Sequence, residues 1–217
     1  MAQTSDSSRP YHHGSLRSTL VLAAAQLVSE RGPAAVSLRE VAARAGVSPA
    51  APYHYFTDKA ALLRAVEEDA FQLLDGELAA TLNRSPDDPI ERLRAVGVSY
   101  VRFVLDRPHY VTLMFRPSQE RGKNVVISRA ARRTFERIAE TVRAARVAAG
   151  HDDDDPLAVM TMMWAVPHGL ALLYVSGPLA TETTPRALED VTRAALTALS
   201  HAPLDELGRD GEFPWGV

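Results

Sequence analysis

The chain has 217 residues with a formal net charge of −3, and 46% of the residues are hydrophobic. This length fits one small and one medium domain, and the absence of cysteine excludes disulfides, thiolate catalysis and cysteine zinc sites. No apolar run is long enough to cross a bilayer. The composition therefore suits a cytoplasmic protein that has no membrane partner.

The N-terminal segment MAQTSDSSRPYHHG is too polar for a signal peptide, and we expect a flexible arm there. Arg9, Tyr11, His12 and His13 suit contacts with a phosphate backbone or a minor groove, like those of basic arms in helix-turn-helix proteins. The alternative is a disordered terminus with incidental histidines. Adjacent side chains such as His12 and His13 seldom converge on one ion without further ligands, so we expect no metal site.

Two helices are predicted in the next thirty residues. The first begins at Ser15, which can cap it, and ends near Gly32. The second begins after Ser37, whose hydroxyl can cap it while Glu40 reaches back to the Ser37 amide in a capping box. Both have one apolar face at helical spacing, made of Leu16, Leu20, Ala24, Leu27 and Val28 in the first and of Leu38, Val41, Ala42 and Ala45 in the second.

A glycine turn at Gly46 separates the second helix from a third. Ser48 followed by Pro49 is a helix start, and we expect this helix to run to about Phe56. Pro52 falls at the fourth helical position, where it removes one backbone bond at most. So short a connection forces the two helices to cross steeply, which frees the third one to enter a major groove.

Tyr53 and His54 are the side chains best placed to face DNA. Consecutive helical residues point about 100° apart, so one or two of the aromatic residues here must point outward. We assign the outward positions to Tyr53 and His54. The alternative is that Tyr53, Tyr55 and Phe56 are all core aromatics.

This pattern resembles the TetR family of transcriptional repressors, whose signature is a helix ending in A-x-x-A-G-V-S, followed by Y-x-x-F and K-x-x-L. The matching residues are Ala42, Ala45, Gly46, Val47, Ser48, Tyr53, Phe56, Lys59 and Leu62. The chain departs from the pattern at Pro52, where an aliphatic residue is usual, and at Ala60 and Ala61, where acidic residues often follow the lysine. The resemblance implies an all-α fold in which residues 1–56 form the arm and the helix-turn-helix domain. The expected DNA contacts are Ser37, Arg39, Ser48, Pro49, Ala50, Tyr53, His54 and Lys59.

Charge is distributed unevenly along the chain. Residues 1–64 hold seven basic and four acidic side chains, an excess of +3, so the remainder carries −6. The positive field is thus concentrated where DNA would lie, and so modest an excess indicates that two such units act together.

Thr57 and Asp58 start a long helix that we expect to continue to about Asn83. Lys59 lies in its first turn, where the helix dipole disfavours a cation, so we interpret it as a contact to a DNA phosphate. The alternative is a solvated lysine. One rigid helix would then join the predicted DNA-contacting segment from Ser37 to Phe56, called the reader below, to the rest of the chain.

Residues 57–202 read as an all-helical ligand-binding and dimerisation domain, followed by a tail at 203–217. The run HDDDD at 151–155 is interpreted as a loop, since consecutive carboxylates point in different directions. Caps, prolines and glycines delimit five further helices. We expect the first from Asp88 to just before Pro108, and a short second one through Leu113 to Phe115. After a loop at 117–123 the third runs to about Ala149, the fourth runs from Pro156 to about Ser176, and the fifth begins at Thr184.

The helix from Pro156 is nearly apolar all round, so it must be buried on several sides. Trp164 and His168 are i, i+4 neighbours, and we expect Pro167 to kink the helix between them. The spacing W-x-x-x-H-G is similar to the WHG-type C-terminal domain of one branch of TetR-like regulators. A kink opens space beside a helix, and the alternative for each neighbouring residue is ordinary core. The expected ligand cavity is lined by Phe71, Tyr100, Phe103, Met114, Phe115, Met160, Met163, Trp164 and His168.

The last helix carries a stripe of mostly small residues that permits close helix approach: Ala187, Leu188, Val191, Ala194, Ala195 and Ala198. The family resemblance implies that this helix and the one from Pro156 form a four-helix bundle with a second copy of the chain.

The sequence therefore predicts a homodimeric repressor that binds palindromic double-stranded operator DNA and is released by a small, largely apolar effector. Three alternatives stay open: an activator or corepressed protein, a ligand-independent DNA-binding or adaptor protein, and a small helical enzyme using His168. We expect neither catalysis nor a cofactor, because no nucleophile or paired carboxylate stands in a recognisable relation to His168.

Overall fold

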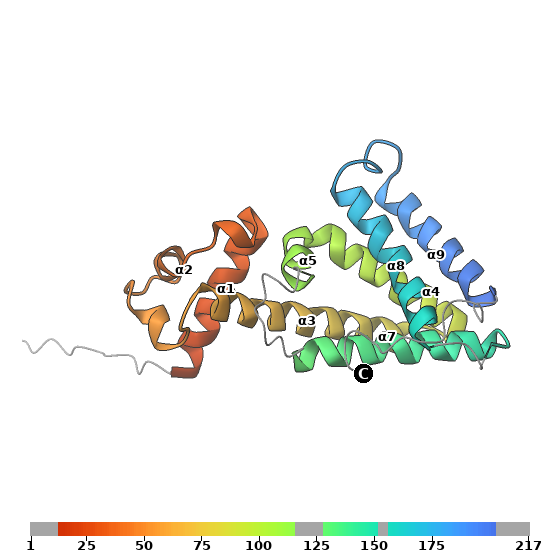
Figure 1. The fold of residues 1–217 in the computed structure, drawn as a ribbon, viewed down its shortest axis with the longest axis horizontal. Coiled ribbons are helices and arrows are strands. Elements are labelled where there is room, and N and C mark those ends of the chain that lie inside the picture. Colours follow the sequence, from red (N-terminus) through yellow and green to blue (C-terminus); the bar gives the residue numbers. More distant parts are fainter. Residues whose placement is uncertain (1–12, 116–127, 152–155, 203–217) are drawn as a thin grey trace, which may run out of the picture. The chain divides into compact units, whose positions relative to one another are not determined.

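The computed structural model describes residues 13–115, 128–151 and 156–202. This part of the chain is all-helical, as predicted, with eight α-helices and two short 3₁₀ helices (Figure 1). The chain divides into two compact units, residues 1–66 and 67–217. The expected arm before His13, the 117–123 loop, the aspartates of the acidic run and the C-terminal tail fall outside the described residues. None of the described helices is long and apolar enough to cross a membrane.

The first unit contains α1 (His13–Arg31), η1 (Pro33–Ala35), α2 (Leu38–Arg44), η2 (Ala51–His54) and the start of α3 (Lys59–Arg84). The predicted inward face of α1 is confirmed, since Leu20 and Val28 are fully buried. The prediction that Ser15 caps α1 is wrong, because His13 and Gly14 before it are already helical. The sequence places the domain boundary at residue 56, before α3, whereas the compact units meet at residue 66, inside it.

The predicted cap of α2 is confirmed. The Ser37 hydroxyl accepts a hydrogen bond from the Glu40 amide at 3.2 Å and donates one to the Glu40 carboxylate at 2.8 Å. The carboxylate thus reaches the hydroxyl, whereas the sequence predicted the Ser37 amide. Gly46 follows with a φ of 68°, a left-handed conformation that glycine adopts without steric cost. The turn between the two reader elements therefore lies where the sequence placed it.

The predicted third helix, Pro49–Phe56, is not an α-helix. Its regular part is the 3₁₀ helix η2, Ala51–His54. Pro52 has no amide hydrogen, and its ring blocks the i to i−4 bond that an α-helix needs at this point. The chain closes i to i−3 bonds in its place, for example from the Tyr53 amide to the Ala50 carbonyl at 3.1 Å. The i to i−4 pattern returns directly after η2, where the Phe56 amide donates to the Pro52 carbonyl at 2.9 Å.

In the second unit, α4 (Pro89–Asp106) packs against α7 (Arg129–Ala148), α8 (Pro156–Val175) and α9 (Pro185–His201), and α5 (Pro108–Met114) follows it directly (Figure 1). These bounds confirm the predicted helices. α8 stays helical through Pro167, and Gly150, with a φ of 88°, ends α7. Side chains cap three of the helix starts: Asp88 accepts from the Glu91 amide at 2.8 Å, Ser128 from Ala131 at 3.1 Å and Thr184 from Ala187 at 3.2 Å.

The contact between α4 and α9 depends on a glycine. A Cβ atom added at Gly97 would lie 2.2 Å from Cδ1 of Leu196 and 3.4 Å from Cγ2 of Thr192. Leu196 and Thr192 are buried on the inner face of α9, so their side chains have little room to rotate away. Gly97 therefore sets how closely the two helices approach.

We expect Gly97→Ala to lower the free energy of unfolding by about 1–3 kcal/mol, the usual cost of overpacking a core. Gly76→Ala is the matched control, because Gly76 lies on the exposed side of α3 and a Cβ atom added there would have nothing within 4 Å. This control should gain about 0.5–1 kcal/mol from helix propensity. Urea denaturation measures both, and equal stabilities for the two variants would contradict the close approach at Gly97.

Arg146 of α7 is a buried cation that the sequence did not single out. It is 2% exposed, and its Nη1 donates to the carbonyl oxygens of Leu199 at 3.0 Å, Ser200 at 3.1 Å and Ala202 at 2.5 Å. These carbonyls belong to the last turn of α9 and the residue after it, where a helix runs out of its own amide donors. The Leu199 carbonyl also accepts from the Ala202 amide at 3.3 Å. Arg146 thus caps the C-terminus of α9 from the neighbouring helix.

Candidate DNA-binding surface and ligand site

Most of the residues expected to contact DNA are exposed on the first unit. Tyr53 is 61% exposed, whereas Phe56 is 3% exposed; His54 is exposed and Tyr55 is half-buried. The aromatic residues are therefore divided between surface and core, which argues against the all-core alternative. Exposed positions also include Arg39, Ser48, Pro49 and Ala50.

Two of the expected contact residues are held by the protein itself. The hydroxyl of Ser37 is engaged with Glu40. Lys59 donates from Nζ to the carbonyl oxygen of Ala34 in η1 at 2.7 Å, which gives the lysine in the first turn of α3 a partner that the sequence did not predict. An ammonium group has three donors, so two of them remain for a phosphate.

The positive charge of the first unit is partly balanced by local ion pairs. Arg44 forms a forked hydrogen bond with Glu30, with Nη2 and Oε2 2.6 Å apart, and this bond lowers the pKa of Glu30. Arg31 lies 3.5 Å from the Glu40 carboxylate. Arg39, in contrast, is exposed on α2. The sequence count of seven cations therefore overstates how many are available to DNA phosphates.

The nine residues expected to line a ligand cavity come together in the second unit. Phe71 from α3, Tyr100 and Phe103 from α4, Met114 from α5 and Met160 and Met163 from α8 are all buried in one core cluster, and Phe115 and Trp164 pack against it. Phe115 lies 5.1 Å from Trp164 and 4.9 Å from His168 between ring centroids. The ring centroids of Trp164 and His168 lie 5.0 Å apart, with the ring planes tilted by 40°. The structure therefore brings all nine residues together, eight from the helices α3, α4, α5 and α8 and Phe115 from the position directly after α5.

Phe135 of α7 belongs to the same cluster and was not predicted. Its ring centroid lies 6.0 Å from Phe71 and 5.6 Å from Trp164. Phe135 lies in the helix predicted to end at about Ala149, and its apolar side chain was the available signal. Nothing in that pattern told this position apart from ordinary core.

Tyr100 and His168 form the polar part of the cluster. The Tyr100 hydroxyl and His168 Nδ1 are 2.5 Å apart. Burial raises the pKa of Tyr100, with the Trp164 side chain acting in the opposite direction, and burial lowers the pKa of His168. Both shifts disfavour the charged form of each group. At neutral pH the pair is therefore an uncharged phenol hydrogen-bonded to an uncharged imidazole.

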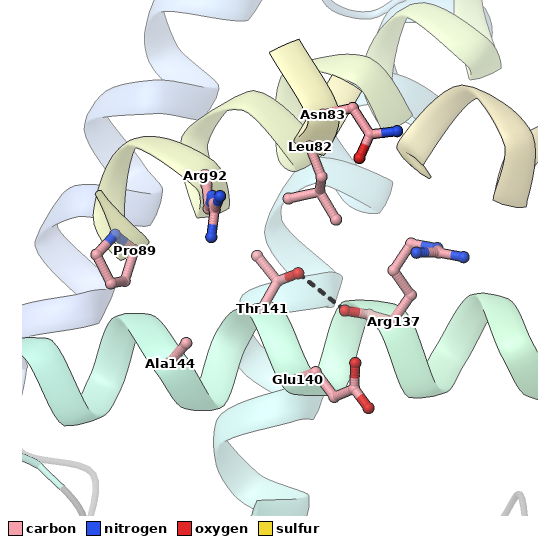
Figure 2. A pocket seen from close by; sticks show the side chains of 8 residues that line it. All are labelled: Leu82, Asn83, Pro89, Arg92, Arg137, Glu140, Thr141 and Ala144. Carbon is pink, nitrogen blue, oxygen red and sulfur yellow. Dashed lines mark hydrogen bonds between the residues drawn. The ribbon is translucent and has the colours of Figure 1, made fainter. Parts of the chain in front are cut away.

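A separate groove of about 510 Å³ lies on the second unit between the end of α3, the start of α4 and α7 (Figure 2). Its polar groups are largely engaged: Thr141 donates to the Arg137 carbonyl at 2.8 Å, Arg137 binds Asp75 at 2.7 Å and Arg92 lies 3.0 Å from Asp87. The groove shares no residue with the predicted cavity. Its lining residues are Leu82, Asn83, Pro89, Arg92, Arg137, Glu140, Thr141 and Ala144.

The described ranges contain no group of three or more His, Asp or Glu side chains suited to hold an ion. An exposed aromatic reader after a glycine turn, joined by one helix to a helical unit with an aromatic core, defines the class of helix-turn-helix regulators.

Comparison with known proteins identifies the family. Residues 20–66 match the family of bacterial regulatory proteins of the tetR type, and residues 93–199 match a tetracycline repressor-like C-terminal domain. The chain therefore belongs to the TetR family of transcriptional regulators, which is not a family of enzymes. The C-terminal match is of this general type, and the WHG subtype remains a prediction.

Individual relatives agree with this assignment. The HTH-type transcriptional regulator BetI of Brucella anthropi is 28% identical over 144 residues, which are 62% of this chain and 74% of that protein. BetI of Rhizobium meliloti is 36% identical over 80 residues, or 37% of this chain and 39% of that one.

Among solved structures, a Rhodococcus sp. RHA1 protein of unknown function is 29% identical, with a TM-score of 0.70, over 88% of this chain and 97% of that one. The regulator FadR of Bacillus subtilis, solved in complex with stearoyl-CoA, shares the fold at 14% identity with a TM-score of 0.60, over 84% of this chain and 97% of that one.

Proposed function

We propose that this TetR-family protein is a cytoplasmic repressor that binds a palindromic operator as a homodimer and leaves it when a small, largely apolar ligand binds the second unit. The observation that carries the DNA-binding part is the exposure of Tyr53 and His54 directly after the glycine turn of the reader. An exposed aromatic and an exposed imidazole in this position can contact base edges and phosphates.

The dimer is proposed to form through α8 and α9. Of the eight exposed large hydrophobic residues in the described ranges, four lie on these two helices: Leu172, Leu173, Val175 and Val191, each 40–49% exposed. Leu188 of the predicted small-residue stripe is buried and belongs to the core, because it faces inward together with Thr192 and Leu196. Val191, Ala194 and Ala198 keep the outer side of α9 small and apolar, as a symmetric helix contact needs.

We expect Leu173→Glu combined with Val191→Glu to yield a folded monomer, because two carboxylates per subunit would be desolvated at the contact. Analytical ultracentrifugation measures the assembly, and operator affinity should fall by about 10²–10⁴, since the second reader no longer benefits from effective concentration. Leu73→Glu is the matched control, because Leu73 is 40% exposed on α3. A dimer that persists in the double variant would place the interface elsewhere.

The ligand response is proposed to travel through α3. This one helix carries Lys59, bonded to Ala34 of the first unit, and Phe71 of the aromatic cluster. Three bonds tie its middle to α7: the Ala130 amide to Glu68 at 3.3 Å, Thr134 to the Phe71 carbonyl at 3.3 Å, and Arg137 to Asp75 at 2.7 Å. A ligand that parts Phe71 from Phe115 and Phe135 would move α3.

Such a movement matters because two readers must fit half-sites about 34 Å apart, one helical turn of DNA. A shift of a few ångströms would prevent simultaneous engagement. FadR of Bacillus subtilis, which was solved with stearoyl-CoA, supports the idea that a bundle of this fold can hold a ligand that has a long apolar chain.

Sequencing of the genomic fragments retained by the purified protein tests the function. The expected result is an inverted repeat whose half-sites are centred about one helical turn apart, and recovery of random fragments would contradict it. Thermal-shift screening with apolar compounds tests the ligand part. Sequence-specific binding without any ligand response would favour the ligand-independent alternative.

A further inference from the structure

His168 differs from the other residues of the aromatic cluster because only one of its two ring nitrogens makes a hydrogen bond within the described ranges. Nδ1 lies 2.5 Å from the Tyr100 hydroxyl. Nε2 makes no hydrogen bond to any residue in the described ranges. The ring is half-buried and is flanked by Trp164 at 5.0 Å and by Phe115, edge to face, at 4.9 Å.

The hydrogen bond to Tyr100 decides which nitrogen carries the proton. A buried phenol with a raised pKa keeps its proton, so the Tyr100 hydroxyl has a proton to donate to Nδ1. With the hydroxyl as the donor, Nδ1 of the neutral imidazole is the acceptor, and the imidazole proton lies on Nε2. His168 thus offers one N–H donor beside the rings of Trp164 and Phe115.

Formal charge is scarce around this donor. None of the nine residues predicted to line the cavity is an acid, a lysine or an arginine. Arg107 lies over the ring of Phe103 at 5.1 Å, and its charge is balanced by Glu77 at 2.9 Å. A ligand carrying a charge would leave it desolvated without a counter-ion here, which is costly.

We propose that the effector is an uncharged molecule with an apolar, ring-containing body and one hydrogen-bond acceptor, such as a ketone or ester carbonyl, which accepts from Nε2–H of His168. Trp164 and Phe115 contact the rings of this ligand, and Tyr100 is the positioning residue that fixes the tautomer. This inference rests on the proposed ligand-released function and narrows the chemistry of its ligand. It separates carbonyl compounds from hydrocarbons and from carboxylates.

The tautomer is tested without any ligand or DNA. ¹⁵N NMR distinguishes protonated from bare imidazole nitrogens, and the His168 signals are assigned by their loss in His168→Gln. We expect protonation of Nε2 in the wild-type chain and a mixture of both tautomers in Tyr100→Phe, which keeps the ring but removes the donor. A wild-type His168 protonated on Nδ1 would overturn the proposal.

Ligand class is tested with three probes of one shape: 2-acetylnaphthalene, 2-isopropylnaphthalene and 2-naphthoate. Calorimetry should show the ketone binding about tenfold or more tightly than the hydrocarbon, since one hydrogen bond in an apolar site is made or lost, with the carboxylate weakest. In His168→Phe the preference for the ketone should vanish while the hydrocarbon still binds. Equal affinities in the wild type, a preference for naphthoate, or no binding of any probe would overturn the proposal.

Operator binding by the same samples separates this inference from the proposed function. If the probes do not bind as expected but sequence-specific DNA binding is intact, only the proposed ligand chemistry is refuted. Loss of sequence-specific DNA binding in the wild-type chain refutes the regulator function itself.

Discussion

Tyr53→Ala combined with His54→Ala should abolish sequence-specific operator binding while leaving the fold intact. Both side chains are exposed, Tyr53 by 61%. Their removal should therefore change the free energy of unfolding little. A lost base contact typically costs about 1–3 kcal/mol. Two such contacts in each of two half-sites predict a loss of at least 10³-fold in affinity, measured by fluorescence anisotropy with labelled operator.

Circular dichroism and ultracentrifugation serve as controls for this double variant, because helicity and assembly should be unchanged. Gln26→Ala is a matched substitution of an exposed residue on α1 outside the predicted reader, and it should retain full affinity. Salt dependence adds a second readout, since loss of base contacts lowers specificity but leaves most phosphate contacts in place. Specific binding retained by the double variant would remove Tyr53 and His54 from the DNA surface.

The starts of α2, α4 and α9 were predictable from sequence because each depends on a few neighbouring residues. Ser37, Asp88 and Thr184 each accept a hydrogen bond from the amide three residues on, as the capping pattern indicates. Gly46 likewise adopts the positive φ that a turn at that point requires. These contacts are local, so the residue types within three or four positions determine where the helix or turn begins.

The element around Pro52 was mispredicted because two local preferences compete there. Helical periodicity and the start at Ser48–Pro49 favour an α-helix, while a second proline three residues later removes the bond that an α-helix needs next. The proline prevails, and η2 results. The outward direction of Tyr53 survives this change, since a short 3₁₀ turn also separates neighbouring side chains around its axis.

Contacts between distant residues were predictable only in part. The aromatic residues of α3, α4 and α8 were grouped correctly, because each lies at an apolar position and few aromatic residues exist to choose from. Phe135 gave no distinguishing signal, although it lies 5.6 Å from Trp164. The bond from Lys59 to Ala34 was missed as well, since a side chain that binds a backbone carbonyl leaves no pattern in the partner's residue type.

Arg146 is the most consequential of the contacts that sequence could not reveal, and its replacement should have the largest effect on stability. On the sequence, Arg146 is one of several arginines along α7. In the fold it is 2% exposed and binds three carbonyl oxygens at the end of α9. A cation at this point also interacts favourably with the negative end of the helix dipole.

We expect Arg146→Met to lower the free energy of unfolding by about 3 kcal/mol. Methionine fills much of the same volume, so the loss reflects the carbonyls of Ser200 and Ala202 that lose the guanidinium donor, each costing about 1–3 kcal/mol when buried. The Leu199 carbonyl keeps its bond from the Ala202 amide. Urea denaturation measures the change, and hydrogen exchange should show faster opening of the last turn of α9 than of its first turns.

Arg143→Met is the matched control for this substitution, since Arg143 is exposed on the same helix and its replacement should stay within about 0.5 kcal/mol of wild type. Arg146→Lys distinguishes charge from geometry. A lysine keeps the positive charge near the helix end but presents a single ammonium rather than a planar guanidinium, so it should recover only part of the loss. Full stability in Arg146→Met would show that water satisfies the carbonyls of Ser200 and Ala202, and that α9 needs no cap from α7.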